Sequence, residues 1–148
     1  MGFWPFGRRA RGLGEPPDYY REGVKLADEG KFHEALTSFR LALRRDPEAS
    51  AIMEEMAVVY TRIGMPEEAE KFYRQAIESG GASPAAHYGV AFLYLRRDDA
   101  EGAKRHLRAF LSRPPQEEGA ARHIEHARRT LRELEGTGAP GSDQQTGG

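Results

Sequence analysis

The sequence predicts an all-α fold built from repeated pairs of antiparallel helices, about seven helices in all. Two observations predict it. Three 34-residue units follow one another without a gap, over residues 16–49, 50–83 and 84–117. Small and large side chains recur at helical spacing in the same columns of these units. A repeat of this length decides the architecture, because each unit buries its apolar face only against its neighbours.

The columns show how the helices of each unit pack. The eighth, twentieth and twenty-seventh positions are small in all but one case: Gly23, Ala57 and Ala91; Ala35, Ala69 and Ala103; Ala42, Ala76 and Phe110. The fourth, eleventh and twenty-fourth positions are mostly large: Tyr19, Met53 and His87; Leu26, Tyr60 and Tyr94; Phe39, Tyr73 and Leu107. Small residues let two helices approach closely, and large residues fill the gaps between their ridges.

Helix-breaking residues separate the predicted helices. Gly30 and Gly64 lie near the middle of the first two units, where each can adopt the left-handed conformation that ends a helix. Pro66 then suits the first turn of the following helix. The units close at Asp46-Pro47, Gly80-Gly81 and Pro114-Pro115.

These columns resemble the tetratricopeptide repeat family over residues 16–117. The resemblance implies a right-handed superhelix of antiparallel helix pairs. Four residues depart from the family pattern: Glu22 occupies an apolar position, Asp98 replaces the mid-unit glycine of the third unit, Gly81 replaces the closing proline of the second unit, and Phe110 replaces an alanine. A bulky side chain at Phe110 predicts contact with the segment that follows.

That segment, residues 118–135, is predicted to form one more helix. Apolar or small residues form a single stripe at Ala120, Ile124, Ala127, Leu131 and Leu134, and Arg and Glu cover the opposite face. A solenoid needs a terminal element with a polar outer face. We therefore expect residues 16–135 to be a repeat domain ending in a capping helix.

Composition narrows the class of protein. The 148 residues suit a single domain, and the net charge of −1 gives no electrostatic case for nucleic-acid binding. The chain has no cysteine, which removes disulfides and thiolate metal sites. No stretch approaches the roughly 18 apolar residues that span a bilayer, and the start has no signal-peptide core. We expect a cytoplasmic protein, and the excess of arginine over lysine indicates a bacterial gene.

The two ends differ from the middle. Residues 136–148 carry no large apolar side chain, so we expect disorder there. Residues 1–15 form an N-terminal arm with three aromatic and three basic residues: Phe3, Trp4, Phe6, Arg8, Arg9 and Arg11. Such an arm suits peripheral contact with the inner face of a membrane. The alternatives are an arm that docks on the repeats or a partner, and an inert tail.

Catalytic and metal signals are weak. His123 and His126 share a face of the predicted capping helix, but zinc needs three or four ligands and no further pair is placed to supply them. Neighbouring glutamates on a helix point about 100° apart, so Glu54-Glu55 is not an acid–base pair. No phosphate-binding glycine loop occurs. We expect no enzyme activity, no cofactor and no metal.

The resemblance implies a concave groove lined by the second, fifth, ninth, twelfth and thirteenth positions of each unit. Those positions give the peptide-binding set Tyr20, Val24, Asp28, Glu54, Val58, Thr61, Arg62, Tyr88, Phe92, Leu95 and Arg96. Family members that grip a C-terminal carboxylate carry Lys, Asn or Arg at the fifth and ninth positions. In this chain none of the residues at the fifth and ninth positions is basic or an amide, so a carboxylate clamp is not expected.

An apolar, partly aromatic groove predicts a binding function. We expect it to take an apolar or amphipathic segment of a partner protein, so that the chain acts as an adaptor in assembling or localising a complex. The alternative is a self-associating scaffold, attached peripherally to a membrane through the arm. Val58 and Phe92 have the alternative role of packing between units, and the arm itself is a candidate occupant of the groove.

The capping helix generates a first test. Leu131→Asp places a charge in the apolar stripe, so it should destabilise the third unit by about 2–4 kcal/mol. Thermal unfolding followed by circular dichroism measures the effect. An unchanged unfolding curve would contradict the capping role.

Overall fold

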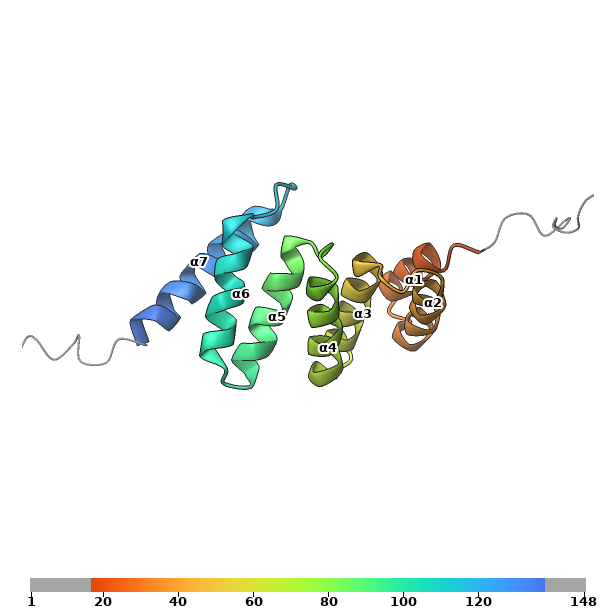
Figure 1. Ribbon diagram of the computed structural model, residues 1–148, viewed down its shortest axis with the longest axis horizontal. Helices are drawn as coiled ribbons and strands as arrows, with labels where there is room; N and C mark the ends of the chain where they lie inside the picture. The colour runs from red at the N-terminus through yellow and green to blue at the C-terminus, as the bar shows by residue number, and fades with distance from the viewer. Residues whose placement is uncertain (1–16, 138–148) are drawn as a thin grey trace, which may run out of the picture. The chain divides into compact units, whose positions relative to one another are not determined.

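The computed structural model describes residues 17–137, and this part of the chain contains seven α-helices and no strand (Figure 1). The predicted all-α fold is therefore confirmed. The helices are α1 (Tyr19–Asp28), α2 (Phe32–Arg45), α3 (Ser50–Arg62), α4 (Pro66–Glu78), α5 (Pro84–Arg96), α6 (Ala100–Ser112) and α7 (Ala120–Thr137).

The chain divides into two compact units, Met1–Asp46 and Pro47–Gly148. The division falls at Asp46-Pro47, where the first repeat was expected to close. Within the described residues, the N-terminal unit holds α1 and α2, and the C-terminal unit holds α3 to α7. The single repeat domain over residues 16–135 stays a prediction, and the two units are treated separately below.

In the N-terminal unit, a small residue lets α1 and α2 approach closely. A Cβ atom on Gly23 would lie 2.5 Å from the ring of Phe39, which is fully buried. The departure at Glu22 has a local explanation, since its Oε1 accepts a hydrogen bond of 2.8 Å from the buried hydroxyl of Ser38 on α2. A polar pair thus replaces the apolar contact of the usual pattern.

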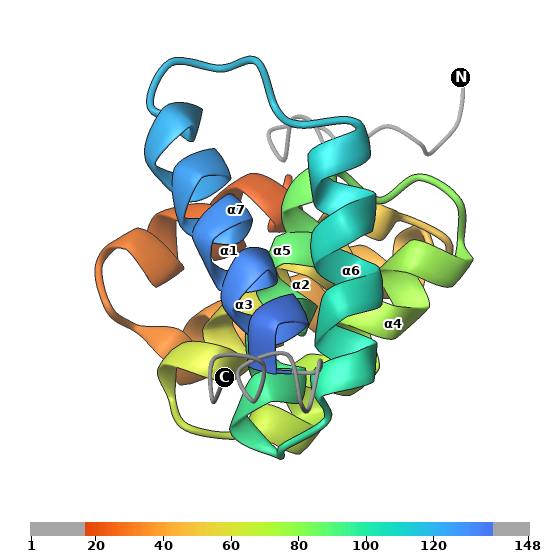
Figure 2. The same ribbon diagram turned by 90° about the vertical axis from the view of Figure 1, so that its left-hand side faces the viewer.

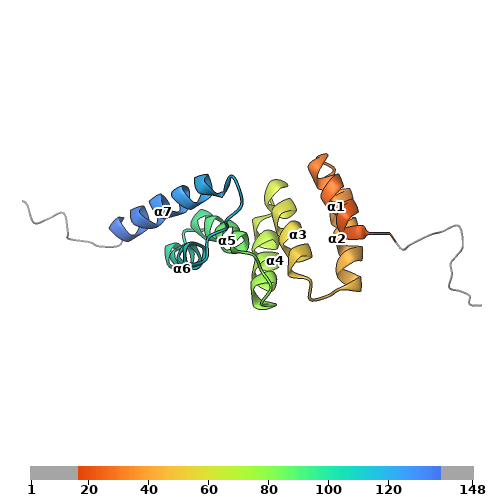
Figure 3. The same ribbon diagram turned by 90° about the horizontal axis from the view of Figure 1, so that it is seen from above.

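The C-terminal unit consists of two antiparallel helix pairs, α3 with α4 and α5 with α6, followed by α7 (Figures 2 and 3). Its most deeply buried large side chains include Met56, Val59, Val90, Leu107 and Phe110. Leu107 and Phe110 belong to the repeat columns, Met56 and Val90 lie one helical turn from the column residues Met53 and His87, and Val59 is next to Tyr60. The core therefore follows the periodicity of the sequence.

Helix α7 caps this unit. Phe110 and Ala127 are both buried and belong to one apolar cluster, against which Leu131 and Leu134 also pack. At the far end of α7, Arg108 Nη2 lies 2.7 Å from Glu135 Oε2. Phe110 therefore contacts the following helix, as its departure from the alanine column predicted.

The bounds of α7 differ slightly from the predicted 118–135. The helix starts two residues later, after Gly119, whose φ is +93°. It also continues through Gly136 and Thr137, which the sequence analysis assigned to a disordered tail. Intrahelical hydrogen bonding extends past the last apolar residue of the stripe, which was the only sequence signal for the end.

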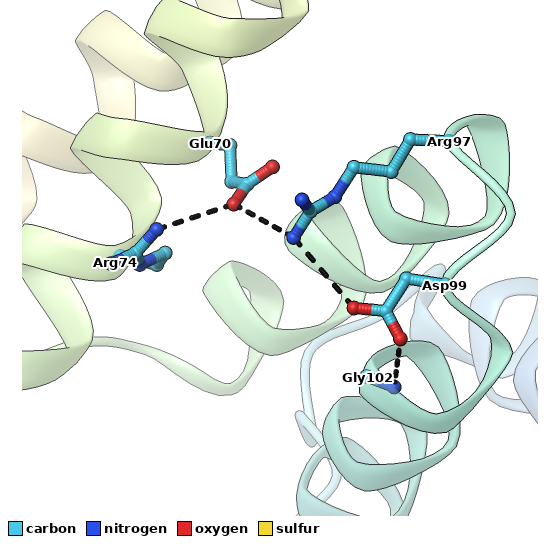
Figure 4. Close-up of polar contacts among 5 residues, drawn as sticks. All are labelled: Glu70, Arg74, Arg97, Asp99 and Gly102. Atoms are coloured by element: carbon cyan, nitrogen blue, oxygen red, sulfur yellow. Dashed lines mark hydrogen bonds and ion pairs between the residues drawn. The ribbon is translucent and has the colours of Figure 1, made fainter.

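A polar network joins the second and third repeats. Glu70 on α4 forms ion pairs with Arg74 Nη1 at 3.3 Å and with Arg97 Nη2 at 3.1 Å (Figure 4). Asp99 lies 3.7 Å from the same guanidinium and caps α6 by accepting a 2.8 Å hydrogen bond from the Gly102 N–H. The α5–α6 turn is thus tied both to α4 and to the start of α6.

The mid-repeat turns share one backbone geometry. Gly64 has a φ of +80° and Asp98, at the equivalent position, has a φ of +63°. In each turn this residue donates its N–H three residues back, and the next residue, Met65 or Asp99, donates to Tyr60 or Tyr94. Asp98 therefore adopts the left-handed conformation that its position requires, at the steric cost of a Cβ.

The turn at Asp98 generates a stability test. Asp98→Gly should stabilise the chain by about 0.5–1 kcal/mol, because relief of the left-handed strain exceeds the added entropy of the unfolded chain. The reciprocal control, Gly64→Asp, should destabilise it by a similar amount. Urea unfolding midpoints measure both. A lower midpoint for Asp98→Gly would contradict this account.

A histidine pair lies between α5 and α6. The Nδ1 atoms of His87 and His106 are 3.0 Å apart, and the ring of His106 also packs 5.3 Å from that of Tyr94. Such a bond needs one N–H and one bare nitrogen, so the two rings cannot both be protonated. Burial lowers the pKa of His106 to about 4, helped by nearby His87 and Arg105 against the effect of Asp99. Burial and Arg113 also lower the pKa of His87, opposed by Glu54.

The pair should make stability depend on pH. Both pKa values are lower in the folded chain than in the unfolded chain, so the unfolded chain binds more protons as the pH falls. The stabilisation is complete above about pH 6.5 and is lost progressively towards pH 4. Because the rings are only partly shielded, we expect a loss on the order of 1 kcal/mol between pH 7 and pH 5.

The residues of the second repeat show which side chains can replace the two histidines in a control variant. Met53 and Phe72 occupy the positions equivalent to His87 and His106, and Phe72 stacks on Tyr60. The double variant His87→Met, His106→Phe should therefore lose less stability than the parent over the same pH range in urea unfolding. Equal losses in both proteins would contradict the assignment.

Candidate functional site: an open groove beside α7

The C-terminal unit contains an open groove with a volume of about 660 Å³. This size is typical of ligand-binding pockets. The groove lies between residues of the second repeat, the third repeat and the start of α7. Its lining consists of Glu54, Glu55, Val58, Tyr73, Ser83, Ala85, Tyr88, Gly89, Phe110, Pro115, Glu117, Glu118, Gly119, Ala120 and His123.

Tyr88 on α5 forms the aromatic centre of the groove. Its ring packs 5.1 Å from Phe110 and meets the ring of His123 edge-on at 5.2 Å. Its hydroxyl lies 2.8 Å from His126 Nδ1 on α7, and burial raises the pKa of this tyrosine. Contacts from α6 and α7 therefore hold the ring in place, which lowers the entropy cost of using it to bind a ligand.

A second tyrosine supports the wall of the groove. Tyr73 on α4 is buried against α5, where a Cβ on Gly89 would lie 2.5 Å from its ring and hydroxyl. Burial, together with the charge of Glu54, raises the pKa of Tyr73 to about 12, although a hydrogen bond with Thr61 acts in the opposite direction. The hydroxyl thus stays neutral, and Gly89 is needed for the close approach of the two helices.

The rim of the groove is acidic. Four glutamates line it, Glu54, Glu55, Glu117 and Glu118, and the lining contains no Lys or Arg. Glu54 accepts hydrogen bonds from the N–H and hydroxyl of Ser83, at 2.8 and 2.5 Å, so it holds the start of α5. Glu117 and Glu118 are exposed just before α7. Side chains of this kind attract positive charge at the edge of an apolar surface.

The structure places the predicted groove residues in several environments. Glu54, Val58 and Tyr88 line the groove, and Val58 is 41% exposed. Phe92 instead stacks on His126 at 4.8 Å, so it packs between α5 and α7. The Thr61 hydroxyl donates to the Ala57 carbonyl at 2.9 Å, inside α3.

The remaining predicted residues do not line this groove. Leu95 is half-buried, whereas Arg62 and Arg96 are exposed near the ends of α3 and α5. Tyr20, Val24 and Asp28 belong to α1 in the N-terminal unit, where the Tyr20 ring lies 6.2 Å from Phe39. The predicted peptide-binding set therefore stays a prediction as a whole.

Several lining residues were not predicted as site residues. Pro115, Glu117, Glu118 and His123 enter the groove because α7 folds back beside α5, and Tyr73 and Gly89 enter it where α4 packs closely on α5. Phe110 gave the one sequence signal, since a large residue in a small column marked a contact with α7. The positions of the glutamates depend on the path of the α6–α7 connection, which has no periodic pattern.

The histidines of α7 pack on aromatic rings. His123 and His126 both contact Tyr88, and residues 17–137 contain no cluster of three or more potential metal ligands. A second pocket, of about 370 Å³, lies beside Arg122 and Arg129 of α7.

No helix in the described part of the chain has the length and apolar character needed to cross a bilayer. The arm residues Phe3, Trp4, Phe6, Arg8, Arg9 and Arg11 lie outside the described residues.

Comparison with known proteins agrees with the repeat pattern. Residues 20–87 match the family model described as "Tetratricopeptide repeat". The TPR repeat-containing thioredoxin TTL4 of Arabidopsis thaliana is 30% identical over 100 residues, which are 68% of this chain but 15% of that protein. The photosystem I assembly protein Ycf3 of Cyanophora paradoxa is 34% identical over 79 residues, 51% of this chain and 46% of that protein. The chain thus spans at most about half the length of these relatives.

Solved structures show the same fold. The Yersinia enterocolitica type III secretion chaperone SycD, in complex with a peptide of the translocator YopD, matches 82% of this chain and 92% of its own. The TM-score is 0.73 and the sequence identity is 13%, so this likeness concerns the fold alone. Three 34-residue units, paired helices and these matches lead to one conclusion: the chain belongs to the tetratricopeptide repeat family, with α7 as a capping helix.

Proposed function

We propose that this protein is a non-enzymatic adaptor that binds an apolar or amphipathic segment of a partner protein in the groove beside α7. The observation that carries the proposal is the fixed aromatic centre at Tyr88 inside an acidic rim. Aromatic side chains held in place by their neighbours are common anchors at protein interfaces. The bound segment then helps to assemble or localise a multiprotein complex.

The chemistry of the groove narrows the kind of segment. Val58 and Tyr88 offer apolar surface to an aliphatic or aromatic side chain. Glu117 and Glu118 favour Arg or Lys next to that side chain, and a neighbouring acidic residue would be repelled. The expected ligand is therefore an apolar sequence flanked by basic residues, which differs from the carboxylate ligands of basic clamps.

The relatives support a role in protein interaction. SycD is a chaperone seen with a peptide of its translocator, and Ycf3 is an assembly protein. The family contains proteins that bind segments of others, and the groove provides this chain with a surface of that kind. A cytoplasmic location and contact of the arm with a membrane remain predictions.

Selection of peptides displayed on phage tests the proposed function. Against the full chain, we expect enriched peptides to combine an aromatic or large aliphatic residue with neighbouring Arg or Lys. Synthetic versions should bind in fluorescence anisotropy, and replacing their basic residues with Glu should weaken binding at least tenfold.

Two substitutions at similarly exposed apolar residues provide the control. Val58→Arg places a cation and a bulky side chain in the groove, so it should weaken binding at least tenfold. Met65→Arg makes the same change at a residue that is 43% exposed and outside the groove, so it should leave binding unchanged. Equal affinities for the two variants, or selected peptides rich in acidic residues, would contradict the proposal.

A further inference from the structure

We infer that the groove beside α7 binds the chain's own N-terminal arm, through the segment Phe3 to Arg11. This inference rests on the proposed function, because it names a ligand for the same groove. The arm carries the combination that the groove favours, an aromatic cluster followed directly by arginines. Charge and side-chain type both favour this occupant.

Charge complementarity is the first argument. The segment carries Arg8, Arg9 and Arg11 and no acidic residue, whereas the groove is lined by four glutamates and no Lys or Arg. The chain as a whole has a net charge of only −1, so this opposition is local and not a property of the whole sequence. Arginine forms two parallel hydrogen bonds with a carboxylate, which makes the exposed Glu117 and Glu118 suitable partners.

The aromatic residues are the second argument. Phe3, Trp4 and Phe6 lie within four positions of one another, and Trp4 is the only tryptophan in the chain. In a segment bound in extended form, side chains two positions apart point the same way, so Trp4 and Phe6 would enter the groove together. The groove volume of about 660 Å³ and the ring of Tyr88 suit this pair.

An anionic membrane is the competing ligand for the same arm. Its aromatic and basic residues also match the chemistry of a lipid headgroup region. The groove is favoured because the described residues contain an apolar surface with an acidic edge, which is the complement of the arm. The test below includes vesicles so that the two ligands are distinguished.

Fluorescence of Trp4 reports directly on the arm, because no other tryptophan contributes. In the full chain without lipid, we expect emission shifted to shorter wavelength than in 6 M guanidinium chloride, as for an indole out of water. Raising the salt from about 0.05 to 0.5 M should reduce the shift, since the arginine–glutamate contacts are screened. A shift lost on dilution indicates an arm from a second copy, and a shift unchanged on dilution indicates the same chain. Both support the inference.

Matched variants assign the shift to the groove. Val58→Arg should move the emission to that of a solvated indole, and Met65→Arg should not. The double variant Glu117→Gln, Glu118→Gln should reduce the shift. Its control, Glu78→Gln with Glu133→Gln, removes the same charge from two exposed glutamates outside the groove and should leave the shift unchanged. Urea unfolding midpoints near that of the parent confirm that each variant is folded.

A peptide of residues 1–15 measures the affinity. It is titrated into the full chain carrying Trp4→Ser and Phe6→Ser, so that the resident arm does not compete. We expect saturable binding, and we expect it to weaken about tenfold when the titrated chain also carries Glu117→Gln and Glu118→Gln. A peptide with Arg8, Arg9 and Arg11 replaced by Gln should bind at least tenfold more weakly.

Three results would overturn the inference. One is solvated Trp4 emission in the full chain that shifts only when vesicles of anionic lipid are added, which assigns the arm to a membrane. Another is an equal effect of Val58→Arg and Met65→Arg on the emission. The third is a failure of the arm peptide to bind while phage-selected peptides do bind, which would leave the proposed function intact. If neither kind of peptide binds, the proposed function fails as well.

Discussion

The packing of Tyr88 against Phe110 and the histidines of α7 is the constraint on which the site depends. Phe110 replaces the small residue of its column, and its ring is buried in a cluster formed by α5, α6 and α7. Helix α7 covers this ring with Ala127, Ile124 and Leu131. With α7 held there, the Tyr88 hydroxyl reaches His126, and the groove acquires a rigid aromatic centre. One large side chain in a small column thus links the end of the repeats to the site.

The same arrangement separates stability from binding on the two faces of α5. Val90, Ala91 and Tyr94 are buried in the helix stack, whereas Tyr88 remains partly accessible in the groove. Phe92 packs against His126 of α7, which reduces the apolar surface left for a ligand. Because the connection before α7 carries Glu117 and Glu118, the remaining surface has an acidic edge. The groove therefore combines a small apolar surface with acidic residues that lie outside the repeat columns.

Polar contacts at the turns hold the repeats in register. Glu70 binds Arg97, which in turn packs 4.6 Å over the ring of Tyr94, and Asp99 of the same turn caps α6. Ser83 at the start of α5 is held by Glu54 from α3. These contacts join elements that the repeat columns bring together, and they are specific to these repeats because the equivalent positions of the other repeats in this chain carry different residues. They explain why residues outside the small and large columns are still structurally constrained.

The sequence by itself determined the helices and most of the core. Periodicity predicts which face of each helix is buried, and glycine and proline mark the turns, because both are local properties of the backbone. It also indicated the cap through Phe110 and the stripe containing Leu131. Only the tertiary structure decided which predicted groove residues share one surface. Phe92 packs under α7, and Glu117, Glu118 and Tyr73 enter the groove, since these outcomes depend on the path of an irregular connection and on long-range packing that periodicity does not encode.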